Sequence, residues 1–432
     1  MLRLALPVVL AEIGWMAMGL VDTLMVGPLG PAAIGATGMS SSIFFAIAVF
    51  GMGVMLGLDA LVSQSFGADR PDDCVRWLHH GVILALVVAP LLMLLAYAAF
   101  STIDSWGLHP DVRAMAVPYL RVITLSTLPL LLYATFRRYL QGVHAVRPVM
   151  YALVTANLVN AAGNWVLVYG RFGAPALGIA GSAWATGIAR TYMALFLWIA
   201  ILREHRRRGP RHTPVPFEYD PQRILQLVRL GVPAASQVTL EVGVFAAVSV
   251  LAGRLDPVSL GSHQIAINIA ALAFMVPLGL SSAAAVRVGH AVGANDPRRA
   301  VQAGWIALAT GGAIMSAIAL VLLAFPAPML RPFSADARVI AIGVRLLAIA
   351  AAFQLFDGTQ AVATGVLRGI GDTRTPVITN VIGHWILGLP VGYALCFWSG
   401  WGVTGLWVGL SIGLVFVAVS LTIVWAARSR RL

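Results

Sequence analysis

GADRP at residues 67–71 returns as GANDP at residues 293–297, and this repeated turn decides the fold. The two copies are 226 residues apart, because 293 − 67 = 226. Five further pairs lie at the same separation: Arg3 and Arg229, Pro7 and Pro233, Gly27 and Gly253, Gly35 and Gly261, and Gly53 and Gly279. An ordered series of matches at a constant offset indicates an internal duplication. The chain is therefore predicted to contain two copies of one structural unit.

The composition excludes a soluble protein. Of the 432 residues, 59% are hydrophobic and only 11% are charged. Soluble globular domains carry about 25% charged residues, so this chain could not cover a soluble surface of its own size. A cytosolic enzyme, a secreted disulfide scaffold and a disordered protein are all excluded on this ground.

The hydrophobic residues fall into twelve continuous segments, each long enough to cross a bilayer as a helix. They are Leu4–Val26, Ile34–Val62, Leu78–Phe100, Ala114–Leu140, Val149–Tyr169, Ile179–Leu202, Ile224–Gly253, Ser259–Ala285, Ala300–Phe325, Val339–Leu367, Pro376–Trp398 and Gly402–Ala427. Continuous rather than alternating hydrophobicity favours helices over a barrel. The first segment runs past Val21 without a cleavage site and is interpreted as a membrane helix, not a signal peptide. We expect an all-α polytopic membrane protein of twelve transmembrane helices.

The longest polar stretch divides these segments into two sets of six. It covers residues 203–223 and contains Arg206, Arg207 and Arg208 with several prolines. We expect an N-lobe at residues 1–202, a cytoplasmic basic linker at 203–223 and a C-lobe at 224–432. Copies with six helices each have the same orientation, and transporters of this kind bind substrates between their halves.

The net charge of +12 comes entirely from arginine, because all 29 basic residues are Arg. Most of them lie on the side of the N-terminus, the even-numbered loops and the C-terminus. The positive-inside rule then predicts that both termini are cytoplasmic. As a separate expectation, we place the chain in the inner membrane of a bacterial cell. The arginines are expected to meet anionic lipid headgroups, so nucleic-acid binding is not needed to explain them. We expect a monomer.

Five acidic residues lie inside the apolar segments: Glu12, Asp22, Asp59, Glu241 and Asp357. Ionisable groups in the membrane are functional candidates by default. Asp22 lies late in the first segment. Asn160 and Asn164 lie four residues apart, on one helical face. Carboxylate and amide oxygens suit a hard cation or a proton relay; the alternative is a hydrogen-bonded structural cluster.

Glu241 and Asp357 lie in the middle of their segments, with no Arg nearby in the sequence. They are candidates for sites whose charge is compensated by Na⁺ or H⁺, against the alternative of permanently protonated structural acids. The two other acids and His384 are left open. Glu12 could reach water or Arg3, and Asp59 could pair with a loop arginine.

Several neutral residues are candidates for a substrate cavity. His263, Gln264 and Asn268 could line a cavity from the eighth segment, or serve a hydrogen-bonded packing role. Met25 belongs to a Met-rich set in the early segments that could form an adaptable binding wall, or face lipid or the core.

Motifs of soluble enzymes are absent from the sequence. It contains no P-loop, no HExxH zinc motif and no GxSxG elbow. The two cysteines, Cys74 and Cys396, form neither a framework nor a metal pattern. We therefore expect neither an enzyme nor a cofactor.

Motifs along nearly the whole chain resemble the multidrug and toxic compound extrusion (MATE) family, and specifically its NorM-like branch. They are VDTLMVG at 21–27, NAAGNW at 160–165, HQIAIN at 263–268, the segment from Pro277 through RVGH at 287–290, Asp357 with LRG at 367–369, and LGLP at 387–390.

The resemblance implies two six-helix lobes in a V shape and export of cationic or amphipathic drugs in exchange for Na⁺ or H⁺. It also implies that Asp22, Asn160 and Asn164 form an N-lobe polar site, and that Glu241 and Asp357 form an acidic C-lobe cation site. The DinF-like branch generally lacks the second pair. Position 353 is Phe where some relatives carry a hydroxyl-bearing aromatic residue, so the C-lobe set has one oxygen ligand fewer. Phe353 is then grouped with the cavity residues.

Other functions remain as alternatives. A lipid-linked precursor flippase of the same superfamily would usually have more helices and a basic cavity. An intramembrane enzyme would need a nucleophile or a metal cluster, which the sequence lacks. A channel would not concentrate its substrate, so concentrative transport that collapses with an ionophore would exclude it.

Overall fold

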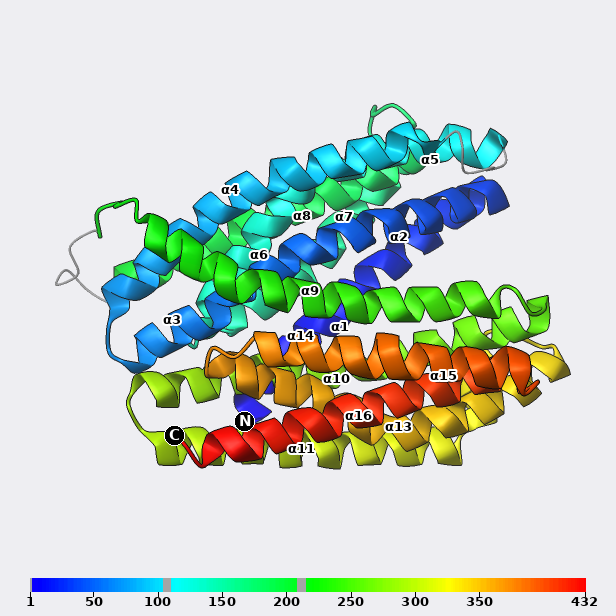
Figure 1. Ribbon diagram of the computed structural model, residues 1–432. Coiled ribbons are helices and arrows are strands. Elements are labelled where there is room, and N and C mark those ends of the chain that lie inside the picture. Colours follow the sequence, from blue (N-terminus) through cyan, green and yellow to red (C-terminus); the bar gives the residue numbers. More distant parts are fainter. Residues whose placement is uncertain (1, 104–109, 208–214) are drawn as a thin grey trace. The chain divides into compact units, whose positions relative to one another are not determined.

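The computed structural model describes residues 2–103, 110–207 and 215–432, and these residues contain helices and no strand (Figure 1). The helices of the first half are α1 (Leu2–Val26), η1 (Gly27–Leu29), α2 (Pro31–Val54), α3 (Gly57–Gly67), α4 (Pro71–Ser101), α5 (Pro110–Leu125), α6 (Thr127–Gly142), α7 (Arg147–Tyr169) and α8 (Ile179–Arg207). Those of the second half are α9 (Pro221–Ala252), α10 (Pro257–Gly293), α11 (Pro297–Ala324), α12 (Pro326–Leu330), α13 (Ala337–Gly369), α14 (Arg374–Asn380), η3 (Val381–Gly388), α15 (Leu389–Tyr393), η4 (Ala394–Trp398) and α16 (Val403–Ser429).

Within the described ranges, eleven helices are long and apolar enough to cross a membrane, and twelve spans result if one bent pair counts as a span. That pair is α5 and α6, which meet at Ser126 with a bend of 42°. It corresponds to the predicted segment Ala114–Leu140. The all-α polytopic fold predicted from the sequence is confirmed within the described residues.

The repeated turn has the same backbone geometry in both copies. Asp69 and Asn295 both have a positive φ, of 55° and 54°, a conformation that Asp and Asn tolerate better than other side chains with a β-carbon. The amide of Asp69 donates to the carbonyl of Phe66 at 3.1 Å, and that of Asn295 to Val292 at 3.0 Å. The same local sequence thus ends α3 and α10 in the same way, 226 residues apart.

The chain forms two compact units, whose borders lie inside helices. The N-unit comprises Leu10–Ala235, and the C-unit comprises the residues up to Val9 together with Ser236–Leu432. Both borders fall at the same place in the repeat, because 235 − 9 = 226. Helices also occupy both ends of the predicted linker, since α8 continues to Arg207 and α9 begins at Pro221. Residues 208–214 of that linker lie outside the described residues.

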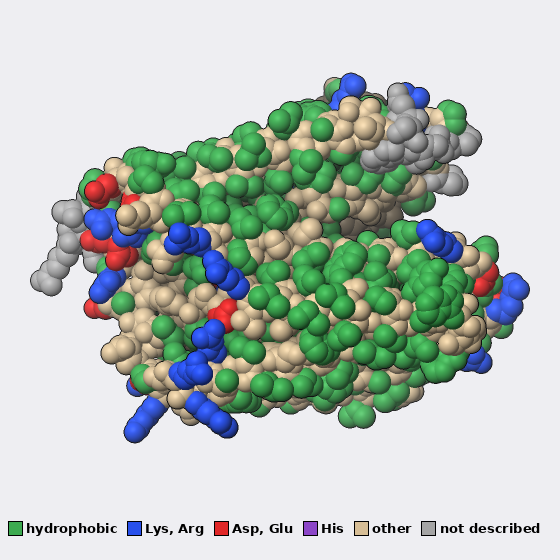
Figure 2. Space-filling view, in the orientation of Figure 1, with side chains coloured by type: hydrophobic (Ala, Val, Ile, Leu, Met, Phe, Trp, Pro, Cys, Tyr) green, Lys and Arg blue, Asp and Glu red, His purple; other side chains and the backbone are tan. Residues whose placement is uncertain are grey.

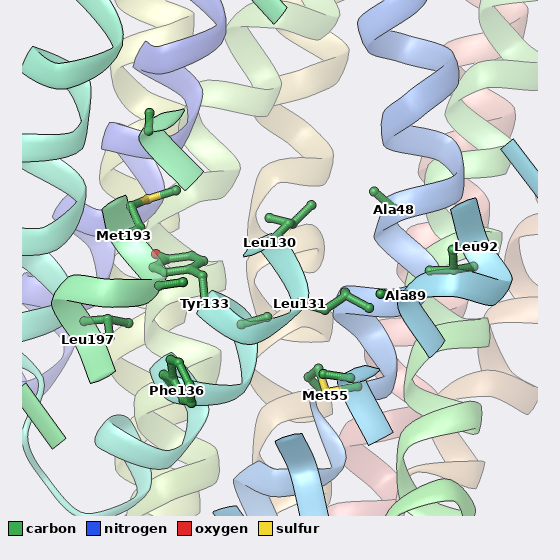
Figure 3. Packing of buried hydrophobic residues seen from close by; sticks show 14 of the residues in the cluster. Ala48, Met55, Ala89, Leu92, Leu130, Leu131, Tyr133, Phe136, Met193 and Leu197 are labelled. Atoms are coloured by element: carbon green, nitrogen blue, oxygen red, sulfur yellow. The ribbon is translucent and has the colours of Figure 1, made fainter. Parts of the chain in front are cut away.

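The core of the N-unit is built from aliphatic, methionine and aromatic side chains. In Figure 3, Leu131 of α6 points toward Ala89 and Leu92 of α4, while Tyr133 lies on the side of Met193 from α8. One hydroxyl in this core is also satisfied by sulfur, because Thr135 lies 3.1 Å from Sδ of Met55. The packing joins α2, α4, α6 and α8 within the N-unit.

Small residues let the helices of the C-unit approach closely. A β-carbon on Gly365 of α13 would lie 2.2 Å from the carbonyl oxygen of Ser281 in α10. One on Gly409 of α16 would lie 2.3 Å from Cα of Gly392 in α15. Close backbone approach through glycine is typical of membrane helices. The last span before α16 contains two π-helical stretches, η3 and η4.

The outer surface suits a bilayer. Figure 2 shows apolar side chains over most of the visible face, with the arginines gathered toward helix ends. In α4, Leu91, Leu94 and Leu95 are 55–67% exposed. Exposed apolar surface on this scale marks an interaction surface, which for a polytopic helical chain is lipid.

Candidate functional site

The N-unit contains a buried polar site centred on Asp22 of α1. Its Oδ1 accepts hydrogen bonds from Nδ2 of Asn160 at 2.9 Å and Nδ2 of Asn164 at 2.8 Å, both from α7. Its Oδ2 accepts from the hydroxyl of Thr186 in α8 at 2.7 Å. All four side chains are buried. The structure thus brings together the three residues that the sequence grouped, and adds Thr186.

Arg190 adds a positive charge near this site. It lies one turn after Thr186 on α8, is buried, and interacts electrostatically with Asp22 without forming an ion pair with it. Arg190 and Thr186 both lie in the expected segment Ile179–Leu202, but neither was singled out from the sequence. The signal for Arg190 was available, because a charge inside a membrane helix is expensive and rarely without function.

The C-unit contains a second acidic site between α9 and α13. Glu241 accepts a hydrogen bond from Nε2 of Gln237, one turn earlier on α9, at 2.6 Å. It accepts another from Nε2 of Gln360 on α13 at 2.8 Å. Neither glutamine was singled out from the sequence, although the four-residue spacing of Gln237 and Glu241 places them on one helix face.

Asp357 lies one turn before Gln360 on α13 and is buried. Its carboxyl is near enough to Glu241 for the two groups to interact electrostatically. Within the described part of the chain, no ion pair or side-chain hydrogen bond to Asp357 is formed. Asp357 therefore lies one turn from the glutamine that binds Glu241, and of the two carboxyl groups only that of Glu241 is held by amides.

Orphaned amide oxygens accompany the carboxyl groups at both sites. Among the residues that the structure describes, Oδ1 of Asn160 and of Asn164 has no hydrogen-bond partner, and neither has Oε1 of Gln360. Carboxylate oxygens beside free amide oxygens are the ligand types that a hard cation prefers. The residues present therefore fit a bound Na⁺ or an exchangeable proton. No cluster of three or more His, Cys, Asp or Glu that suits a metal ion occurs among the described residues.

The two remaining acids are paired with arginines of α6. Glu12 pairs with Arg137, with both side chains buried. Asp59 lies 3.5 Å from NH1 of Arg138. Glu12 thus pairs with Arg137, while the side chain of Arg3 lies outside the described residues. Asp59 pairs with an arginine that belongs to a helix. Sequence reasoning could not find these pairs, because each joins helices about 80 or more residues apart.

The structure separates the cavity candidates of α10 into two kinds. His263 is fully buried; Nδ1 accepts from Nε1 of Trp407 at 3.0 Å, and Nε2 lies 2.8 Å from the hydroxyl of Ser249. This geometry favours the packing role. Gln264 and Asn268, by contrast, are exposed on one face of the helix.

The other candidates are more enclosed. Phe353 is buried against Trp407, with ring centroids 5.8 Å apart. Met25 is half-buried, and its carbonyl accepts a hydrogen bond from Tyr169 at 2.5 Å. His384 is buried in η3. Of this group, only Met25 keeps a partly accessible side chain.

The fold and its buried sites define a polytopic helical membrane protein. The MatE family model matches residues 7–166 and 233–394, and the chain belongs to this family. The chain is 36% identical over 436 residues to the probable multidrug resistance protein NorM of Mesorhizobium japonicum, covering 99% of this chain and 93% of that one. It is 34% identical to the probable multidrug resistance protein NorM of Bradyrhizobium diazoefficiens, with coverage of 100% and 93%.

Solved structures agree on the fold. A crystal structure of MATE in the bent conformation superimposes with a TM-score of 0.90 at 18% identity, covering 100% of this chain and 95% of that chain. The match spans the whole chain, so both units share the architecture of that structure.

Proposed function

We propose that the protein exports cationic or amphipathic organic compounds in exchange for Na⁺ or H⁺. The names of its relatives, multidrug resistance proteins, support the substrate class. MATE proteins are transporters and not enzymes, so the buried acids serve binding rather than covalent chemistry.

One observation carries the coupling. Among the described residues, Asp22, Glu241 and Asp357 form no ion pair, whereas Glu12 and Asp59 each pair with an arginine. A carboxylate inside a membrane protein that has no positive charge paired with it is costly, even where amides or hydroxyls donate to it. A cation or a proton that arrives from solution removes this cost. The three acids outside ion pairs are therefore the proposed coupling groups.

The exchange follows from competition for these groups. In the outward-open state a cation from outside neutralises the acids and the drug leaves. In the inward-open state the drug enters from the cytoplasm or the inner leaflet. Each ligand shifts the equilibrium only as far as it binds the two states unequally. The membrane potential adds about 2.3 kcal/mol per charge per 100 mV.

The proposed setting is the inner membrane of a bacterial cell, with both termini in the cytoplasm and the protein acting as a monomer. The arginine distribution supports this orientation. The exposed face of Gln264 and Asn268 and the half-buried Met25 are the proposed substrate contacts.

Reconstitution in liposomes tests the proposal. A pH gradient and a Na⁺ gradient are imposed separately, and uptake of a fluorescent organic cation is followed. We expect at least one gradient to drive concentrative uptake that an ionophore abolishes. If neither gradient moves the cation, antiport is excluded. Uptake that never exceeds equilibrium would instead indicate a channel.

A further inference from the structure

Aromatic rings, rather than a carboxylate, hold the guanidinium of Arg190. Its central carbon lies 4.7 Å from the centroid of Phe44 and 5.9 Å from that of Trp15. NH1 donates a hydrogen bond of 2.6 Å to the hydroxyl of Ser126. That hydroxyl is fixed in turn, because it donates to the carbonyl of Ile123 at 2.6 Å. We call Trp15, Phe44 and Ser126 the Arg190 cage.

Another buried arginine of the same unit shows how unusual this is. Arg137 is paired with the carboxylate of Glu12, as a buried guanidinium normally requires. Arg190 has no carboxylate within ion-pair distance in the described part of the chain, and its Nε has no hydrogen-bond partner. A guanidinium held by two ring faces and one hydroxyl is held by replaceable contacts.

The same contacts would hold a foreign cation. A ring face attracts any cation within about 6 Å of its centroid, and flat delocalised cations give up their hydration more readily than an ammonium group does. Asp22 supplies longer-range attraction without binding Arg190 directly. Trp15 is also partly exposed, whereas Phe44 and Arg190 are buried. The cage is therefore least enclosed at Trp15.

We propose that the Arg190 cage is a binding site for flat organic monocations, which the protein's own Arg190 occupies in this structure. A ligand enters as the guanidinium of Arg190 leaves. One monocation then replaces another near Asp22, so the charge at the site is unchanged. A neutral molecule of the same shape would not restore that charge and is therefore rejected. The part that this site plays in export rests on the proposed function; the binding itself does not.

Arginine removal and ligand binding test the site on purified protein, without any gradient. Arg190→Ala opens the cage, and Arg190→Lys keeps a charge but loses the flat guanidinium. The probe is benzylguanidinium, and the matched neutral control is benzylurea. Binding is measured by calorimetry and by quenching of tryptophan fluorescence.

We expect benzylguanidinium to bind Arg190→Ala about tenfold more tightly than wild type, with Arg190→Lys between them. Benzylurea should bind all three equally weakly. In Arg190→Ala/Phe44→Leu the gain should disappear. Methylguanidinium at low millimolar concentration should also raise the melting temperature of Arg190→Ala more than that of wild type.

Equal affinity of Arg190→Ala and wild type for benzylguanidinium would overturn the proposal, as would a gain that survives Phe44→Leu. If Arg190→Ala cannot be purified, the test rests on Arg190→Lys. The proposal is then overturned if Arg190→Lys binds benzylguanidinium no more tightly than wild type does. Binding as expected with no gradient-driven uptake would defeat the proposed function and leave the site standing. Gradient-driven uptake without the expected binding would contradict the Arg190 cage as a binding site and leave the proposed function standing.

Discussion

Nε2 of Gln360 donates a hydrogen bond of 2.8 Å to Oε1 of Glu241, and this bond joins α13 to α9 across 119 residues of sequence. It directly links the helix of Glu241 to the helix of Asp357. Gln354, two turns before Gln360 on α13, is fully buried, yet neither of its side-chain polar atoms has a partner among the described residues.

Gln360→Met should therefore lower stability, whereas Gln354→Met should not. Gln360→Met loses a hydrogen bond between membrane helices and should cost about 0.5–2 kcal/mol. Gln354→Met removes an unsatisfied buried group and should be neutral or stabilising. Thermal unfolding followed by size-exclusion chromatography measures both, and a larger loss for Gln354→Met would contradict this account.

Neutralising the acids that lack ion pairs should uncouple transport without unfolding the protein. Asp22→Asn, Glu241→Gln and Asp357→Asn keep the side-chain shape but lose the titratable group. We expect normal expression and no gradient-driven ethidium efflux from cells. Normal efflux by all three variants would contradict the assignment of these acids as coupling groups.

Asp256→Asn is the matched control for these variants. Asp256 caps α10 from outside the spans, and hydrogen bonds from Ser259 hold the pKa of its carboxyl below the ordinary value. Asn caps helices about as well as Asp, so stability and efflux should both be retained. Loss of efflux here would mean that removing any acid disturbs the protein.

Breaking the ion pair of Glu12 should affect stability more than transport chemistry. Glu12→Gln leaves Arg137 buried without its partner, which costs about 3–5 kcal/mol. Replacing both residues, with Glu12→Leu and Arg137→Met, should restore most of this loss. Melting temperatures of the single and double variants check the prediction, which fails if the double variant is the less stable.

The polar residues of α10 should separate into structural and substrate-facing groups. Trp407 donates to Nδ1 of His263, so Nε2 carries the proton and donates to Ser249. His263→Phe leaves the indole N–H of Trp407 without its acceptor, while the hydroxyl of Ser249 keeps its bond to the carbonyl of Phe245. This change should cost about 1–3 kcal/mol. Gln264→Leu and Asn268→Leu should keep the melting temperature and slow drug transport. A His263→Phe protein that stays stable but loses drug binding would reverse these roles.

The sequence predicted the helices better than their interruptions. Hydrophobic length located each span, yet the bend at Ser126 and the π-helical stretch Val381–Gly388 carry no local signal of comparable strength. The segments Ile34–Val62 and Ala114–Leu140 read as continuous because apolar residues continue through each break. Hydropathy reports burial in lipid and does not report the path of the backbone.

The acids were predictable individually, but their partners were not. Charge in an apolar segment marks Asp22 and Glu241, whereas the amide and hydroxyl groups that bind them are common and carry no such mark. The duplication does not predict the positions of the acidic residues. Asp22 corresponds to Val248, because 22 + 226 = 248, and Glu241 corresponds to Trp15, because 241 − 226 = 15. The two halves keep one backbone pattern and place their charges differently.

The border between Val9 and Leu10 has a consequence for biosynthesis. The first turns of α1 belong to the C-unit, where a β-carbon on Gly279 would lie 2.6 Å from Cγ2 of Val9. Domains generally fold as they emerge from the ribosome, with the N-terminal one first. Here the N-unit is complete only after residue 235 has been made, and the C-unit needs residues up to Val9, which are made before any residue of the N-unit. The first turns of α1 can therefore pack only after α10 has been made, and a ribosome that stops in the linker leaves neither unit complete.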